Sequence, residues 1–487
     1  MIRTAADTIG HLAPATDLLP LLPVLVLAAA AFFLLLFDLF LKESQRGITH
    51  WLAVGSLLLA AAMTALGSGG DGSVFGGMFL RDTMANVLNA FILLISAAAL
   101  LYVGAGLRER GLYKGEVPVL VLFSAIGMML LTSAGNMVMV YLGLEMLALC
   151  SYALVAVDRD SPKSSEAAMK YFVLGSLASG LLLYGMSLIY GATGTLDLAA
   201  LREAVAVTDD RMLLLTGVVF LVAGIAFKFG AAPFHMWLPD TYHGAPTPIT
   251  LFIGSAPKLA AFAMAWRLLE SGLGPVQANW ALLLSALAVA SLVVGNLIAI
   301  MQTNLKRMLA YSTISHVGFL LLGLVGGTPD AYAAAMFYAI AYGIMSVAAF
   351  GAIVMLSSKG FEAEQIDDFK GLNARSPWMA GLVLLIMASL AGVPPLLGFW
   401  AKMAVLRAAL EGGYLWLAIV GVVFAVIGAF YYLRVIKVMY VDAPEGEQVQ
   451  VRRDGSLRLV FTANALALLV LGIFWNPLMA WCQAAFA

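Results

Sequence analysis

Long apolar runs, separated by short polar stretches, cover most of the 487-residue chain. An α-helix needs about 20 mostly apolar residues to cross the roughly 30 Å hydrocarbon core of a bilayer. Runs of this length predict an all-α polytopic membrane protein with about 14 transmembrane helices, and no β-strand is needed to explain the pattern. The predicted spans cover residues 18–40, 48–66, 78–104, 117–134, 136–157, 163–191, 211–238, 245–270, 279–302, 304–325, 330–358, 376–410, 412–441 and 457–483.

The composition excludes a soluble globular protein, because 62% of the residues are apolar, only 11% are charged, and the mean hydropathy is +0.95. The 27 lysines and arginines nearly cancel the 28 acidic residues, so no excess of positive charge favours nucleic acid as a partner. Cys150 and Cys482 lie far apart in the sequence, which gives neither a disulfide framework nor metal-ligand spacing.

Basic residues are divided unequally between the two sets of loops. The loops after odd-numbered spans hold 17 lysines and arginines, whereas the other side, with both termini included, holds six. Because cytoplasmic loops are enriched in Lys and Arg, we expect the odd-numbered loops to be cytoplasmic and both termini to lie on the periplasmic side.

Ionisable side chains also occur inside the predicted spans. Four of them are lysines, and Glu145 is the only carboxylate near the middle of a span. Such groups usually face the bundle interior and mark ion or proton paths. Lysine suits a proton relay because its proton affinity responds to burial and to nearby carboxylates, whereas arginine stays charged. One snorkelling lysine or one buried ion pair is the structural alternative, but a set of this size favours proton transport. The lysines are Lys170, Lys228, Lys258 and Lys402.

Prolines interrupt the predicted helices close to three of these lysines. Proline has no N–H, so it releases the carbonyl four residues earlier from the helix. A free carbonyl at membrane depth is tolerated where it is buried in protein or lines a hydrated cavity, which favours a functional site over a packing kink. The breaks are at Pro233, Pro257, Pro394 and Pro395; Pro233 releases the carbonyl of Phe229, and Pro394 and Pro395 release those of Leu390 and Ala391.

The breaks at Pro233 and at Pro394 lie five spans apart, in the seventh and twelfth predicted helices. Five is an odd number, so spans 4–8 and 9–13 would form two repeats of opposite orientation with the site near the midplane. We therefore expect four segments: an N-terminal three-helix segment at 1–116, a first five-helix repeat at 117–272, a second, inverted repeat at 273–441, and a cytoplasmic loop with the last helix at 442–487.

The five histidines divide into two groups. His11, His50 and His243 lie at predicted span ends and are expected to be solvated. His235 follows the Pro233 break, and His316 lies within a span one helical turn after Ser312 and directly after Ser315. Histidine with neighbouring hydroxyls can pass protons, so His235, His316, Ser312 and Ser315 are relay candidates. A histidine that only bonds a neighbouring helix is the alternative for either one.

Several motifs of other protein classes are absent or misleading. The sequence has no phosphate-binding G-x-x-x-x-G-K-[ST] loop, which argues against ATP-driven transport by this chain. The glycine pattern at 67–72 follows a predicted membrane helix rather than a strand, so we interpret it as a loop. No cysteine run fits an iron–sulfur cluster, so we expect no cofactor or metal in this chain.

Four stretches of sequence carry a family resemblance: Tyr141–Tyr152, Pro233–Pro248, Lys306–His316 and Val393–Phe399. In them the chain resembles the antiporter-like membrane subunits of respiratory NADH:quinone oxidoreductase, complex I. The resemblance covers roughly residues 117–440 and implies 14 helices with inverted five-helix repeats. It also implies a proton-translocating subunit of a bacterial cytoplasmic membrane.

The resemblance further implies roles for the buried groups. Glu145 and Lys228 would form a modulating pair, Lys258 with His316 nearby the central relay, and Lys402 the terminal site, with Lys170 as a further family lysine. FMN and iron–sulfur clusters are expected in partner subunits, and NADH and quinone are expected as substrates of the whole complex. The expected partners are antiporter-like neighbours, small membrane subunits and the lipid bilayer.

Two other classes of function remain open from the sequence. One is a subunit of a multi-chain sodium/proton antiporter, because such proteins share broken helices and buried lysines. The other is a passive membrane scaffold, in which neutralising the buried groups would change assembly only.

Overall fold

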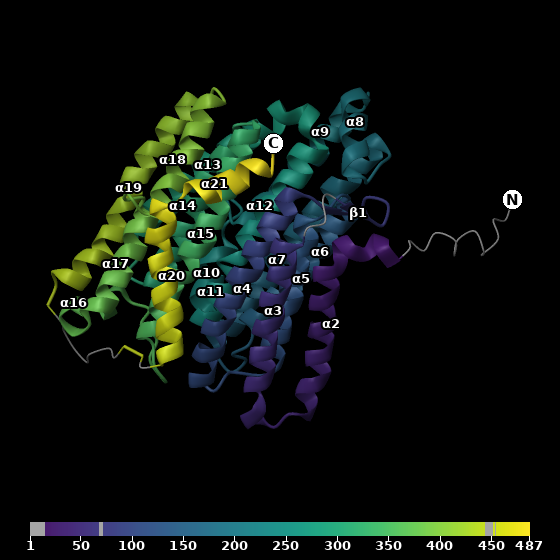
Figure 1. Cartoon of the computed structure of the whole chain (residues 1–487). Coiled ribbons are helices and arrows are strands. Elements are labelled where there is room, and N and C mark those ends of the chain that lie inside the picture. Colours follow the sequence, from purple (N-terminus) through teal and green to yellow (C-terminus); the bar gives the residue numbers. More distant parts are fainter. Residues whose placement is uncertain (1–14, 68–71, 444–450, 453) are drawn as a thin grey trace.

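The computed structural model describes residues 15–67, 72–443, 451–452 and 454–487 as a bundle of helices that run roughly side by side (Figure 1). A two-stranded antiparallel hairpin, β1 (Gly72–Val74) and β2 (Phe79–Arg81), joins the second and third spans. The hairpin lies outside the helices that could cross the membrane, so it adds strands to a fold whose spans are helical.

The α-helices of the described residues are bounded as follows: α2 Leu22–Phe37, α3 Gly47–Leu66, α4 Thr83–Glu109, α5 Glu116–Thr132, α6 Met137–Val155, α7 Pro162–Thr193, α8 Leu198–Val207, α9 Arg211–Phe229, α10 Trp237–Gly244, α11 Thr247–Ile253, α12 Ala256–Trp266, α13 Gln277–Met301, α14 Leu305–Val325, α15 Pro329–Leu356, α16 Leu372–Arg375, α17 Pro377–Ala391, α18 Leu397–Glu411, α19 Leu415–Tyr440, α20 Gly455–Ile473 and α21 Asn476–Ala484.

Within the described residues, 12 helical segments are long and apolar enough to cross a membrane. Two further apolar helices, α5 and α17, are shorter. Each of the predicted apolar runs contains one of these helices. The structure therefore confirms a helical polytopic membrane protein, with 12 candidate spans by length and composition.

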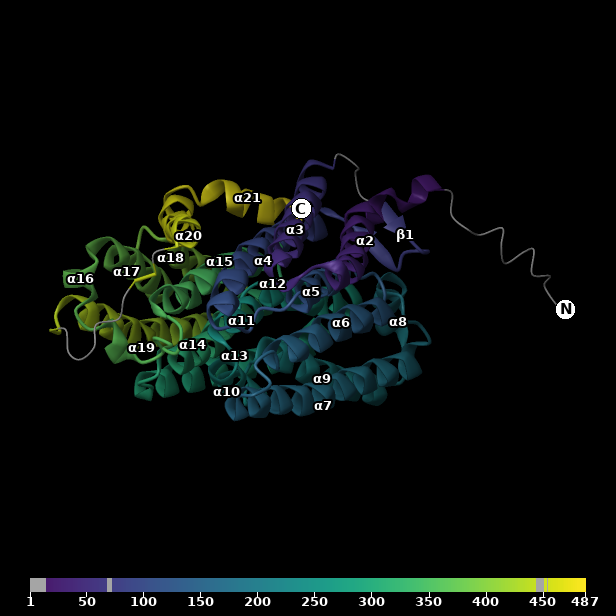
Figure 2. The same ribbon diagram turned by 90° about the horizontal axis from the view of Figure 1, so that it is seen from below.

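The most enclosed helices lie in the middle of the bundle, as the view from below shows for α12 and α15 (Figure 2). The most apolar part of α15 is 100% buried, whereas that of α19, at one edge, is only 28% buried. The exposed residues of the edge helices include Phe32 and Val426, which suits contact with lipid. Lys258 on α12 and Lys306 on α14, which are 3% and 1% exposed, are therefore removed from both lipid and water.

Helices α5 and α6 approach closely because glycines face each other at their crossing. A Cβ added to Gly143 would lie 2.9 Å from the carbonyl oxygen of Gly127. Small residues allow helix backbones to pack at short range in membranes. This crossing fixes the turn of α6 that carries Glu145, two residues beyond Gly143.

Four of the predicted spans are interrupted, one of them without a predicted break. Helix α9 ends at Phe229 before Gly230, and α17 ends at Ala391 before Gly392, both glycines having positive φ. The run predicted at 245–270 is split between α11 and α12, and Pro257 lies in the first turn of α12, where its missing N–H costs no helix bond. The last run is split into α20 and α21, and α21 lies across the ends of its neighbours (Figure 1).

The segment between α15 and α17 ties the two halves of the bundle together. Its Glu362 accepts ion pairs from Arg110 at 2.9 Å and from Lys306 at 3.4 Å. The same carboxylate accepts hydrogen bonds from the main-chain N–H and the hydroxyl of Thr247, at the start of α11. Residues of both predicted repeats therefore meet on one carboxylate.

Candidate functional site

The break after α9 brings a lysine from another helix to the carbonyl that proline releases. Pro233 leaves the main-chain oxygen of Phe229 without its helical partner, and the Nζ of Lys258 donates a hydrogen bond to that oxygen at 2.8 Å. Lys258 is only 3% exposed, and its Nζ also lies 5.5 Å from the centre of the Trp237 ring. A buried ammonium is thus held by a helix C-terminus and an aromatic face.

Lys228 lies on the other side of the same break, one residue before Phe229. It lines a small pocket between α6, α7, α9 and α10, whose open volume of about 20 Å³ is enough for about one water molecule. The aromatic rings of Tyr152, Tyr171 and Trp237 line the same pocket. Among the described residues no hydrogen-bond acceptor contacts the Lys228 ammonium, so it is free to bond to water there.

Glu145 and Lys258 both act on Lys228 through their charges. The Glu145 carboxylate attracts the Lys228 ammonium, and the Lys228 and Lys258 ammonium groups repel each other. Glu145 and Lys228 are not in direct contact, because no ion pair within 4.0 Å joins them, and the Oε1 atom of Glu145 has no hydrogen-bond partner in the described part of the chain. The predicted pair is therefore separated in this structure.

The second break repeats the arrangement of the first. The Nζ of Lys402, on α18, donates hydrogen bonds of 2.9 Å to the main-chain oxygens of Leu390 and of Ala391. These are the two carbonyls that Pro394 and Pro395 release from α17. Lys402 is 7% exposed, and its Nζ lies 5.3 Å from the centre of the Phe319 ring. At both breaks, then, a buried lysine caps the C-terminus of a broken helix beneath an aromatic ring.

Three of the four predicted lysines lack a carboxylate partner. Within the part of the chain that the structure describes, no Asp or Glu lies within 4.0 Å of the Nζ of Lys228, Lys258 or Lys402. Burying an unpaired ammonium is costly, so a site of this kind responds strongly to any nearby change of charge.

His316 is the centre of a hydrogen-bonded group on α14. Its Nδ1 lies 2.7 Å from the hydroxyl of Tyr338, and its Nε2 lies 3.1 Å from the hydroxyl of Tyr432. The Tyr432 hydroxyl also bonds to that of Ser312. Ser312 and His316 are therefore joined, as their spacing suggested, but through a tyrosine of α19. The charge that acts on His316 comes from Lys402, and among the described residues no hydrogen bond joins His316 to Lys258.

Helix α15 carries a stripe of hydroxyl groups on one face, at Tyr338, Tyr342 and Ser346, each four residues after the last. Tyr342 donates to the hydroxyl of Thr313 at 2.7 Å, and its ring lies 5.0 Å from that of His316. Ser346 donates to the main-chain oxygen of Gly254 at 3.0 Å, at the break between α11 and α12. One end of the stripe therefore lies at the break that precedes Lys258. The other end lies at His316, close to Lys402.

Ser315 belongs to a second small group beside the first. Its hydroxyl accepts a hydrogen bond from the side-chain amide of Asn296 at 2.8 Å, and Asn296 accepts one from Tyr431 at 3.1 Å. This group holds α13, α14 and α19 against one another, and in the described part of the chain it makes no hydrogen bond to a lysine.

Lys170 and His235 have different surroundings from the buried lysines. The Lys170 side chain is 43% exposed and forms ion pairs of 2.8 Å with both Glu166 and Asp240. Asp240 also pairs with Arg307 at 2.9 Å, so Lys170 belongs to a charged network on the outer face of α7. His235 is half-buried in the turn before α10, and in the described structure its Nδ1 has no hydrogen-bond partner.

Two histidines at span ends are covered by neighbouring parts of the chain. His243 and His50 were expected to be solvated, but His50 is only 2% exposed, and His243 is half-buried at 3.3 Å from Asn304. His11 lies outside the described residues. Both described histidines are near span ends, but neighbouring loops and helices cover them, which the sequence could not show.

The chemistry of the described site rests on amines, an imidazole, a carboxylate and hydroxyl groups. In the described ranges, no group of three or more His, Cys, Asp or Glu residues is placed to hold a metal ion. What the arrangement can do is hold, release and pass protons between ammonium, imidazole, hydroxyl and water.

The sequence reasoning missed Tyr338, Tyr342, Ser346 and Tyr432. The spacing of the first three was visible as one face of a predicted helix, but tyrosines in an apolar span usually indicate packing. Tyr432 lies 116 residues after His316, and no local pattern connects them.

Comparisons with known proteins agree with this architecture. The profile of a family described as NADH:quinone oxidoreductase/Mrp antiporter, TM, matches residues 134–428. NADH-quinone oxidoreductase subunit N of Xanthomonas euvesicatoria pv. vesicatoria (strain 85-10) is 64% identical over 482 residues, which cover 99% of each chain. A chain of respiratory complex I from Thermus thermophilus superposes with a TM-score of 0.82 at 31% identity, covering 96% of this chain and 100% of that one.

A chain of the Mrp complex from Dietzia sp. DQ12-45-1b has the same fold but a much more distant sequence. Its TM-score is 0.84 over 97% of both chains, at 21% identity. This likeness concerns the fold alone.

Proposed function

Because this chain belongs to the NADH:quinone oxidoreductase/Mrp antiporter membrane family, in the subunit N branch, we propose that its line of buried lysines is a proton path. The chain is a proton-translocating subunit of the membrane arm of NADH:quinone oxidoreductase, and the cofactors of that complex reside elsewhere. The path joins Glu145, Lys228, Lys258, His316 and Lys402 across the middle of the bundle.

The observation that carries this proposal is the matched pair of helix breaks. At each one a buried lysine without a carboxylate partner donates to carbonyls that proline has released. A lysine needed only to fill space would not be placed twice against a helix C-terminus in the membrane interior, where an unpaired charge is costly. A relay needs such a group, because it can hold or release a proton without breaking the fold.

The path has three parts: a cluster of ionisable residues at each helix break, and the hydroxyl stripe of α15 between the two clusters. Glu145, Lys228 and Lys258 interact through their charges at the first break, and His316 and Lys402 do so at the second. The hydroxyls of Tyr342 and Ser346 lie between them on α15. When the Glu145 carboxylate approaches Lys228, the ammonium form of Lys228 is favoured and repels a proton from Lys258 towards His316.

The membrane arrangement is part of the proposal. Fourteen spans, with α5 and α17 as the two shorter ones, place spans 4–8 (117–272) and 9–13 (273–441) in two inverted repeats. The similar breaks after α9 and α17 support this division. The charge distribution of the loops supports periplasmic termini in the bacterial cytoplasmic membrane. A reporter enzyme active only in the periplasm, fused to the C-terminus, checks this orientation.

The expected partners are antiporter-like neighbours and small membrane subunits of the same complex, with flavin and iron–sulfur clusters in other subunits. Affinity purification of this chain in mild detergent tests the assignment. Flavin, iron and NADH-oxidising activity that co-purify with the chain support it, and isolation of the chain with neither flavin nor iron contradicts it. Proton uptake driven by NADH, and lost on replacement of Lys402, then ties the activity to the proposed path.

A further inference from the structure

A pocket with one charged end and apolar walls opens at the end of the bundle where α4 ends and α3 and α20 begin. Its volume is about 430 Å³, and Trp51, Arg108 and Leu457 lie on its wall. All three helices are candidate membrane spans, and each contributes residues from the turns near the same end. The mouth of the pocket therefore lies where the bilayer meets water.

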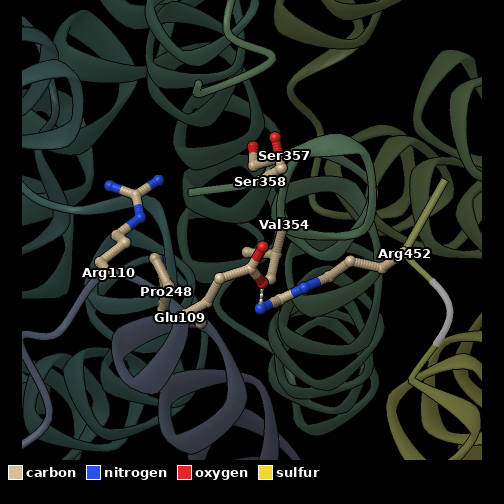
Figure 3. A pocket seen from close by; sticks show the side chains of 8 residues that line it. Glu109, Arg110, Pro248, Val354, Ser357, Ser358 and Arg452 are labelled. Carbon is tan, nitrogen blue, oxygen red and sulfur yellow. Dashed lines mark ion pairs between the residues drawn. The ribbon is translucent and has the colours of Figure 1, made fainter. Parts of the chain in front are cut away.

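The wall of this pocket carries two arginines and two carboxylates, and among the described residues Arg108 is the arginine without a carboxylate partner. The Arg108 guanidinium lies 4.6 Å from the centre of the Tyr113 ring, and no carboxylate of the described residues lies within ion-pairing distance of it. Of the two acidic residues on the wall, Glu109 pairs with Arg452, as the dashed line in Figure 3 marks, and Asp454 caps α20 by accepting from the N–H groups of Ser456 and Leu457. The cation left over is Arg108.

The walls below Arg108 are apolar and lead into the membrane. Ala105 and Leu101 follow Arg108 down one face of α4 at helical spacing, and Val460 lies one turn inside α20. His50 forms part of the wall, and its Nδ1 has no hydrogen-bond partner in the described structure. A charged mouth above an apolar track has the shape of an amphiphile binding site.

We propose that this pocket binds an anionic glycerophospholipid of the surrounding leaflet. The headgroup phosphate pairs with Arg108, because guanidinium and phosphate form short, charge-assisted hydrogen bonds. One acyl chain follows Leu101, Ala105 and Val460 between α4 and α20. The lipid thereby joins the N-terminal helices to the last span, two parts of the chain that are more than 300 residues apart in sequence.

The test uses the assembled complex in detergent with phosphatidylglycerol that carries a photoreactive group on one acyl chain. Labelled peptides of α3, α4 and α20 are measured by mass spectrometry. Arg108→Gln removes the phosphate partner, and Ala105→Phe fills the apolar track without changing charge. Arg159→Gln is the matched control, because Arg159 is an exposed arginine, 72% accessible, outside the pocket. Native gels confirm that each variant is present in the complex.

Labelling of the three helices in the wild-type complex is expected to fall about tenfold in Arg108→Gln, the effect of one charge-assisted hydrogen bond. A comparable loss is expected in Ala105→Phe and none in Arg159→Gln. The proposal is overturned if Arg108→Gln is labelled like the wild type or if inorganic phosphate alone protects the site. It is also overturned if the photoreactive lipid labels a neighbouring subunit rather than α3, α4 and α20. If Arg108→Gln fails to assemble, Ala105→Phe and the phosphate competition decide between the same outcomes.

Discussion

The Nζ of Lys258 donates a hydrogen bond of 2.8 Å to the main-chain oxygen of Phe229. That carbonyl is free because Pro233 interrupts the helix, and the residue before it is Lys228. A change in the proton on Lys258 therefore changes the bond that holds the end of α9 and, with it, the surroundings of Lys228. Proton transfer and helix-end geometry are linked at one atom.

Replacing Lys258 with Met is expected to lower NADH-driven proton uptake by roughly 100-fold, the lower end of what a positioned proton-transferring group contributes. Lys258→Arg is the informative comparison, because arginine keeps the charge and the donors but does not release its proton. We expect the Lys258→Arg variant to assemble normally but to show the same loss of proton uptake as Lys258→Met. Full uptake with Arg at this position would show that the charge alone is needed, and the relay role of Lys258 would be wrong.

Tyr432→Phe removes the hydroxyl that bonds to both His316 and Ser312. We expect a several-fold loss of proton uptake, with a stability cost of about 1 kcal/mol for the lost hydrogen bonds. The measurement is proton uptake per complex in inverted vesicles, with thermal denaturation of the complex measured in parallel.

The control for Tyr432 is Tyr440→Phe, on the same helix α19, since Tyr440 is 38% exposed and lies at its end. Equal uptake in the two variants would remove Tyr432 from the path.

Lys170→Ala is expected to affect proton uptake much less than Lys228→Ala. The Lys170 ammonium is shared by Glu166 and Asp240 at an exposed face, where solvent screens ion pairs so that they contribute little. Proton uptake and the yield of assembled complex are compared in both variants. A loss in Lys170→Ala as large as that in Lys228→Ala, at normal assembly, would place Lys170 on the path.

The loop that carries Glu362 should stay attached to Arg110, Lys306 and Thr247 over the whole physiological pH range. Burial raises the pKa of the Glu362 carboxyl, but the Lys306 ammonium and the Arg110 guanidinium overcome that effect and lower the pKa to about 2, from its ordinary value of 4.5. A depressed carboxyl pKa stabilises the fold above the unfolded value, and this stabilisation is lost only as the pH falls from 4.5 towards 2. Hydrogen exchange of residues 357–371 between pH 5 and 8, corrected for its intrinsic rate, is expected to be constant.

Glu362→Gln leaves Lys306 buried without its full counter-charge, a loss of about 3 kcal/mol by analogy with broken buried ion pairs. Faster exchange of the loop and of the first turn of α11 is expected at every pH. Glu43→Gln, which changes a carboxylate that is 91% exposed, should leave exchange unchanged. Unaltered exchange in Glu362→Gln would mean that the loop is held by its other contacts.

The helix breaks could be predicted from the sequence because their chemistry is local. Proline removes one N–H, so the carbonyls of Phe229, Leu390 and Ala391 could be named in advance, and each is bonded to a buried lysine in the structure. Which lysine serves which carbonyl could not be predicted. Lys258, on another helix, serves the first break although Lys228 is nearer in sequence, and only tertiary packing decides this.

The sequence also could not predict which face of each helix is buried and which faces lipid. An apolar helix in a membrane carries little periodic contrast between its buried and lipid-facing sides, so Lys170 could not be distinguished from Lys228 before the structure was known. For the same reason the hydroxyl stripe of α15 could not be separated from ordinary aromatic packing. The break between α11 and α12 was predicted at Pro257 but lies at Gly254, because a proline is tolerated in the first turn of a helix.

The most direct test of the proton path is Lys228→Ala, with Lys170→Ala as the matched lysine control. NADH-driven quinone reduction and proton uptake are measured together in inverted membrane vesicles, after the assembled complex has been quantified. The path predicts that both activities fall together in Lys228→Ala, because electron transfer and proton transfer are coupled. Wild-type levels of both in Lys228→Ala would show that Lys228 is structural and would contradict the path.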